Sequence, residues 1–133
     1  MGNVSAIKHS TEGKPHNISE RSFAYALRAI NLYQYLQDRK DGAGWILGKQ
    51  YLRAACSIGA NIEESQAAES RADFIHKFGI AQKEARESLF WLRLMSKAEI
   101  VPRKKLALLI SETEELVRVI TSIILNTKGK NPR

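Results

Sequence analysis

The most regular pattern of apolar and polar positions in this chain lies between residues 72 and 97. Apolar residues recur there at steps of three and four, which place them on one stripe of a helix of about six turns. The stripe comprises Phe74, Phe78, Ala81, Ala85, Ser88 or Leu89, Leu92 and Met95. Ser70 and Asp73 precede it with the S-x-x-D spacing of a capping box. The pattern therefore predicts a helix over residues 72–97.

A second helix is predicted just before it, over residues 45–69. One arc of this helix is apolar and contains Tyr51, Leu52, Ala55, Cys56, Ile58, Gly59 and Ile62. The opposite arc carries polar residues at spacings of four, four and three, which stack along a helix: Arg53, Ser57, Asn61 and Glu64. Gly59 is a poor helix former, so we expect it to permit the close approach of a neighbouring helix.

The first predicted helix, residues 20–38, has apolar side chains on two faces. Ser19 is its predicted N-cap. One face carries Phe23, Ala26, Leu27, Ile30, Tyr33 and Gln34, and the other carries Tyr25, Leu32 and Leu36. Such a helix is either central in a larger body or shared between subunits, and the small size of the domain favours the second interpretation. The alternative is a scatter of surface apolar residues, which is common in soluble proteins.

The last predicted helix covers residues 102–126, with Pro102 in its first turn. Its wide apolar face contains Leu106, Leu109, Ile110, Thr113, Leu116, Val117, Ile120, Ile123 and Ile124. Residues 38–44 are predicted to form the first turn. Because short links between long helices make neighbours antiparallel, the chain is predicted to be all-α, an antiparallel up-down-up-down four-helix bundle over residues 19–126. Residues 1–18 are expected to be flexible, and residues 127–133 to form a basic tail.

The 133 residues carry a net charge of +7, which is compatible with an acidic partner such as nucleic acid. The positive excess lies toward the two ends of the chain. The candidate nucleic-acid-binding residues are Arg21, Arg28, Arg103, Lys104, Lys105, Lys128, Lys130 and Arg133. No stretch is long and apolar enough to predict a membrane span. The single cysteine, Cys56, is predicted to be a core residue and fits a reducing cytoplasm.

Motifs for nucleotide, metal or cofactor binding do not occur in the sequence, so neither a metal site, nor a cofactor, nor catalysis is expected. Two carboxylates, Glu84 and Glu87, lie among apolar and aromatic positions of the 72–97 helix. They could serve acid–base chemistry if buried in an open pocket. We instead favour a polar network or a subunit interface, because buried carboxylates need partners. Its members would be Arg53, Ser57, Asn61, Glu64, Glu84 and Glu87.

The stretch SIGANIEESQAAESRADFIHKFGIAQKEARESLFWLRLM, residues 57–95, resembles the family of 23S rRNA intervening-sequence proteins. The matching positions are Ser57, Asn61, Ile62, Glu64, Phe74, Ile75, Ala81, Glu87 and Leu92. Many members have a Gly-Ser pair where this chain has Lys83 and Glu84. The resemblance covers about residues 20–126 and implies a bundle that assembles as a ring, a homopentamer. It extends to the accessory protein of diversity-generating retroelements, a basic pentamer that works with a reverse transcriptase and nucleic acid.

Two functions are compatible with these observations. The first is a non-enzymatic ring-forming protein that binds RNA or a ribonucleoprotein through basic surface, with contacts dominated by phosphate. The second is a protein-interaction scaffold without a nucleic-acid role, whose basicity is incidental. Basic side chains that gather on one surface would favour the first function, whereas scattered cations would favour the second.

Overall fold

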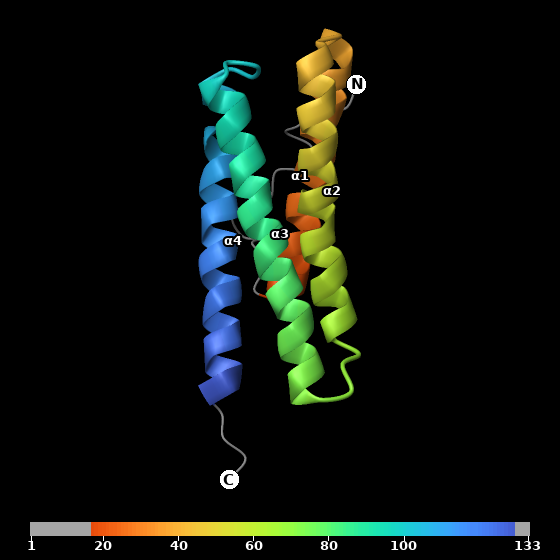
Figure 1. The fold of residues 1–133 in the computed structure, drawn as a ribbon, viewed down its shortest axis with the longest axis vertical. Helices are drawn as coiled ribbons and strands as arrows, with labels where there is room; N and C mark the ends of the chain where they lie inside the picture. Colours follow the sequence, from red (N-terminus) through yellow and green to blue (C-terminus); the bar gives the residue numbers. More distant parts are fainter. Residues whose placement is uncertain (1–16, 130–133) are drawn as a thin grey trace.

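The computed structural model describes residues 17–129, which form a four-helix bundle without strands (Figure 1). In chain order the helices are α1 (Ile18–Arg39), α2 (Gly42–Ser65), α3 (Arg71–Lys97) and α4 (Arg103–Gly129). Figure 1 shows the α1–α2 and α3–α4 connections at one end of the bundle and the α2–α3 connection at the other. The all-α prediction is confirmed. Nearly all of the segment predicted to be flexible, residues 1–18, and Lys130 and Arg133 of the predicted tail lie outside the described residues.

Side-chain caps explain where the first two helices begin. The Asn17 side chain accepts a hydrogen bond from the Glu20 backbone N–H at 2.8 Å, so Asn17 is the N-cap of α1 and the prediction of Ser19 is wrong. Asp41 caps α2 by accepting from the backbone N–H of Ala43 at 3.0 Å. This cap starts α2 three residues before the predicted position. The turn predicted over residues 38–44 is therefore reduced to two residues between the helices.

The third and fourth helices match the predicted pattern closely. Ser70 caps α3 as predicted, because its hydroxyl accepts from the Asp73 backbone N–H at 3.0 Å. α2 ends at Ser65, four residues before the predicted end, and a turn leads from there into α3. α4 continues to Gly129, so residues 127–129 belong to the helix and not to the predicted tail.

The core lies along the stripes predicted for α2, α3 and α4. On α3 the buried residues are Phe78, Ala81, Ala85, Ser88, Leu92 and Met95, which confirms the stripe apart from its half-buried first member, Phe74. On α4 they are Leu106, Leu109, Thr113, Leu116, Ile120 and Ile124. Fully burying a side chain such as Leu92 contributes about 1.5–3 kcal/mol, so these stripes supply the main force that holds the helices together.

On α1 only one of the two apolar faces enters the core. The buried face carries Ser22, Tyr25, Ala29, Leu32 and Leu36. The other face stays in solvent, with Phe23 68%, Leu27 37% and Ile30 39% exposed. Within residues 17–129, this apolar stripe on α1 is therefore left without a partner.

Glycines let α1 and α2 approach each other closely. A Cβ atom built on Gly59 would lie 3.4 Å from the backbone oxygen of Ser22, so the predicted close approach at Gly59 is confirmed. A tighter contact occurs at Gly48, where a Cβ atom would lie 2.7 Å from Cδ1 of the buried Leu36. The α2 backbone thus packs against the α1 backbone and the Ser22 side chain at Gly59, and against the Leu36 side chain at Gly48.

Candidate functional site

The polar face predicted on α2 and α3 centres on Arg53. Its Nη2 atom lies 2.6 Å from Oε2 of Glu87, and its Nη1 atom lies 3.5 Å from Oε1 of Glu84. The indole N–H of Trp91 donates to the same Glu87 oxygen at 2.9 Å. The hydrogen bonds from Trp91 and Arg53 lower the pKa of Glu87, so this carboxylate stays ionised. That direction is the opposite of the raised pKa that a general acid at neutral pH would need.

The other predicted members of this network do not join Arg53. The Asn61 side-chain amide donates to the backbone oxygen of Ser57 at 2.9 Å and to its hydroxyl at 3.1 Å. Glu64 pairs with Lys77 of α3, with 2.8 Å between the charged atoms. The six predicted residues therefore form three separate groups. Asn61 bonds within its own helix because residues four apart stack on the same side of a helix.

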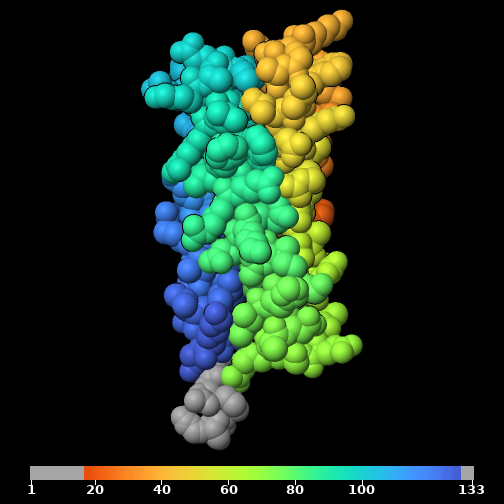
Figure 2. All heavy atoms as spheres, viewed as in Figure 1, coloured from red at the N-terminus to blue at the C-terminus, as the bar shows by residue number. Residues whose placement is uncertain are grey.

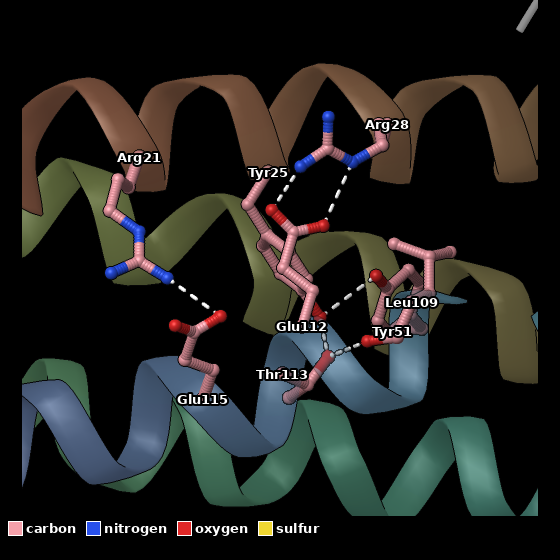
Figure 3. Close-up of polar contacts among 8 residues, drawn as sticks. All are labelled: Arg21, Tyr25, Arg28, Tyr51, Leu109, Glu112, Thr113 and Glu115. Carbon is pink, nitrogen blue, oxygen red and sulfur yellow. Dashed lines mark hydrogen bonds and ion pairs between the residues drawn. The ribbon is translucent and has the colours of Figure 1, made fainter. Parts of the chain in front are cut away.

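Arg21 and Arg28 were predicted to bind nucleic acid, but the structure places them against carboxylates of α4 (Figure 3). Arg28 forms a two-pronged ion pair with Glu112, and only 11% of the arginine side chain is exposed. Arg21 pairs with Glu115 at 2.9 Å. Sequence alone could not reveal these partners, since Arg28 and Glu112 are 84 residues apart. The two arginines join α1 to α4.

A chain of buried hydroxyl groups lies beside these ion pairs (Figure 3). The Thr113 hydroxyl donates to the Leu109 backbone oxygen at 2.6 Å, so its contact of 2.6 Å with Tyr25 is one in which Tyr25 donates. Tyr51 donates in turn to the Tyr25 oxygen at 2.9 Å. Burial raises the pKa of Tyr25 to about 12, which keeps the phenol protonated and able to donate. Sequence reasoning missed this chain because it counted these residues only as parts of apolar faces.

Three of the predicted nucleic-acid-binding residues, Arg103, Lys104 and Lys105, lie exposed in the first turn of α4. Two cations from the end of α1, Arg39 and Lys40, lie at the same end of the bundle. Arg39 and Lys105 both contact Tyr35 of α1, with their charged groups 5.3 and 5.1 Å from the centre of its ring. Sequence reasoning missed Arg39 and Lys40 because they fell in the predicted turn.

We call this surface the basic end; it comprises Arg39, Lys40, Lys97, Arg103, Lys104 and Lys105. The segments 38–41 and 97–105 contain these six cations and three carboxylates. The segment 63–73 at the opposite end holds four carboxylates and one arginine. Charge is therefore unevenly distributed along the bundle. Lys128 does not belong to the basic end, because it lies in the last turn of α4.

A groove of about 230 Å³ opens next to the basic end, between α1 and α4. It is lined mainly by apolar atoms of Leu32, Tyr35, Leu108 and Leu109, together with Arg28, Asn31 and Lys105. The Asn31 side-chain nitrogen is buried and has no hydrogen-bond partner within residues 17–129. The lining of the groove is therefore mainly apolar.

Within residues 17–129, no group of three metal-ligating side chains occurs, and no helix is long and apolar enough to cross a membrane. Cys56 is half-buried, and its burial raises the pKa of the thiol.

Comparison with known proteins agrees with the fold and with the sequence resemblance. A family model described as 23S rRNA-intervening sequence protein matches residues 14–122. A solved structure of a protein of unknown function from the S23 ribosomal protein family of Bacteroides thetaiotaomicron is 38% identical, with a TM-score of 0.76. The match covers 81% of this chain and 98% of that one. No curated protein gives a significant match. The chain belongs to the family of 23S rRNA-intervening sequence proteins.

Proposed function

We propose that this chain is a non-enzymatic cytoplasmic protein that binds RNA, or an RNA-bound protein, through its basic end. In this proposal its protomers are antiparallel up-down-up-down bundles that assemble into a ring, a homopentamer as the family resemblance implies. The observation that carries the proposal is the gathering of six exposed cations from three helices at one end of the bundle.

The first turn of α4 gives this observation its weight. The N-terminus of a helix carries a partial positive charge, so each cation there costs about 0.3–1 kcal/mol at low salt. α4 nevertheless has three cations and no carboxylate in this turn. Within the described residues, Arg103 and Lys104 have no ion pair that would offset this cost. Local features that oppose the stability of the fold are expected at functional surfaces.

Assembly would strengthen binding at this surface. Apolar side chains are exposed along the sides of the bundle, and Trp45 and Ile46 in the first turns of α2 are exposed near the basic end. Copies that pack side by side around an axis parallel to the helices would place every basic end on the same face of the ring. Such a face would contact several phosphates at once, and its affinity for RNA would fall steeply with salt.

The second candidate is a scaffold that binds a protein partner and no nucleic acid. The apolar stripe on α1 favours this candidate, because an exposed apolar patch is typical of protein–protein contacts. The S23 relative is assigned by name to a ribosomal protein family, which favours a partner that contains RNA. We therefore place the scaffold second.

The test is binding of a fluorescent structured RNA at low and high salt, with the oligomer followed by light scattering. The variant Arg103→Glu/Lys104→Glu should bind at least tenfold more weakly than the wild type. In a plot of the logarithm of RNA affinity against the logarithm of salt concentration, the slope should become roughly one unit shallower for each lost phosphate contact. The same substitutions should raise the melting temperature, because they place carboxylates at the N-terminus of α4.

The matched control is Arg118→Glu/Lys128→Glu, which makes the same charge change at exposed positions far from the basic end of α4. It should keep most of the RNA affinity. An equal loss in both variants would mean that binding follows net charge and not the basic end. If the wild-type oligomer binds no RNA even at low salt, the scaffold becomes the better proposal.

A further inference from the structure

The apolar stripe on α1 is part of a longer regular pattern. Exposed positions on this helix follow each other at steps of three and four, which is the spacing of a coiled-coil seam. The α1 outer stripe consists of Glu20, Phe23, Leu27, Ile30, Gln34 and Asp38. Its centre is apolar, and both of its charged members are carboxylates.

α3 carries a second exposed stripe, whose members follow each other at steps of three and four except for the adjacent pair Arg93 and Leu94. This α3 outer stripe consists of Lys83, Arg86, Phe90, Arg93, Leu94 and Lys97. Phe90 is 54% exposed and Leu94 is 38% exposed, so the stripe has an apolar centre of its own. Its four charged members are all cations, and one of them, Arg93, already pairs with Glu114 of α4 at 3.3 Å. The α3 carboxylates Glu84 and Glu87 lie outside this stripe, because they face Arg53 of α2. The charge of this stripe is thus opposite to that of the α1 outer stripe.

The two stripes lie on opposite sides of the molecule. α1 packs against α2 and α4, and α3 packs against the same two helices, so α1 and α3 occupy opposite corners of the bundle. Figure 2 shows α3 exposed along the front of the molecule, where little of α1 can be seen. One copy therefore presents two different, complementary faces that point in opposite directions.

We propose that the α1 outer stripe of one copy packs against the α3 outer stripe of the next copy. A contact between two different faces is heterologous, and its repetition closes a ring when the rotation between copies allows it. A two-fold dimer would instead bury one kind of face and leave the other in solvent. This inference rests on the assembly part of the proposed function, and it does not depend on RNA.

Charge and position support this pairing. Copies related by rotation about an axis parallel to the bundle have their corresponding ends at the same height. Asp38 near the end of α1 would then lie level with Lys97 at the end of α3, since both residues belong to the end that holds the α1–α2 and α3–α4 connections. The apolar centres would exclude water between the two helices, and the charged ends would set the orientation.

The test uses two single variants, Leu27→Lys on α1 and Phe90→Lys on α3. Both substitutions are at exposed positions, so each variant should fold with the helix content of the wild type in circular dichroism. Each places a lysine in an apolar centre, and each should convert the wild-type oligomer into a monomer in light scattering. Leu125→Lys, at another exposed apolar position, is the matched control and should remain oligomeric.

Mixing the two variants gives the decisive measurement. The Phe90→Lys chain keeps an intact α1 stripe, and the Leu27→Lys chain keeps an intact α3 stripe. One intact contact can therefore form between them, while the second contact would bring two lysines together. Native mass spectrometry should show a one-to-one heterodimer and no larger species.

Several results would overturn the inference. If either variant remained oligomeric like the wild type, or if the mixture formed no heterodimer, the two stripes would not be the contact, although ring assembly itself would stand. If Phe90→Lys kept the wild-type subunit number and bound RNA more tightly than Leu125→Lys, which adds the same charge, the α3 stripe would be an RNA surface instead. A monomeric wild-type chain would overturn ring assembly together with this inference.

Discussion

At the scale of single residues, Thr113 is the residue that connects the buried hydroxyl chain to the backbone of α4. Its hydroxyl oxygen accepts a hydrogen bond from the Tyr25 O–H, and its own O–H donates to the Leu109 backbone oxygen. Tyr25 is fully buried, so a lost acceptor could not be replaced by water. The direction of donation therefore decides which substitution is costly.

We predict that Thr113→Val destabilises the fold by about 1–3 kcal/mol, because it removes the acceptor of the buried Tyr25 O–H. Tyr51→Phe should cost less, about 0.5–1.5 kcal/mol, because it removes only a donor to an oxygen that keeps its own partner. Urea unfolding at one protein concentration measures both values. Thr113→Ser, which keeps the hydroxyl, is the control. A larger loss in Tyr51→Phe than in Thr113→Val would show that the chain runs in the other direction.

At the scale of helices, the contact between α1 and α2 differs between its two glycines. At Gly59 an added Cβ atom would make an ordinary contact of 3.4 Å, so the site has room for it. At Gly48 it would lie 2.7 Å from Leu36, whose side chain is buried and would have to move within the core. Two substitutions with the same chemistry should therefore have opposite effects.

We expect Gly59→Ala to raise the free energy of unfolding by up to about 1 kcal/mol, through the better helix propensity of alanine. Gly48→Ala should lower it by about 1–3 kcal/mol, since overpacking costs more than the propensity gain. Thermal unfolding of the two variants provides the comparison. Equal stabilisation in both would mean that Leu36 relaxes at little cost and that α1 is not tightly held at this height.

The helices also show which features sequence patterns can predict. α4 has one wide apolar face, and the long apolar stripe of α3 outweighs the two exposed apolar residues Phe90 and Leu94, so each of these helices has one clear way to face a core. α1 has two, and Tyr25 and Leu32 on one face are about as apolar as Phe23 and Leu27 on the other. Periodicity could not decide between these faces, because the choice depends on how α2 and α4 pack around α1. The partners of Arg28 and Arg21 escaped prediction for the same reason, since they lie on a helix distant in sequence.

At the scale of the whole molecule, the uneven charge distribution matters more than the net charge of +7. Six cations share the basic end with three carboxylates, and repulsion among them opposes folding. Salt screens such repulsion, because the Debye length is about 10 Å at 0.1 M. The same salt also weakens the favourable ion pairs elsewhere. Only a comparison between variants therefore isolates the contribution of the basic end to the salt dependence of stability.

We predict that added salt stabilises the wild type relative to Arg103→Glu/Lys104→Glu, in which cations no longer exceed carboxylates at this end. The difference between their melting temperatures should therefore shrink as salt is added. Arg118→Glu/Lys128→Glu should keep the salt response of the wild type. If the ring places several basic ends on one face, salt should reduce this difference in melting temperature more strongly at protein concentrations where the oligomer forms. A salt response that is the same in all three proteins would show that these cations do not repel one another measurably.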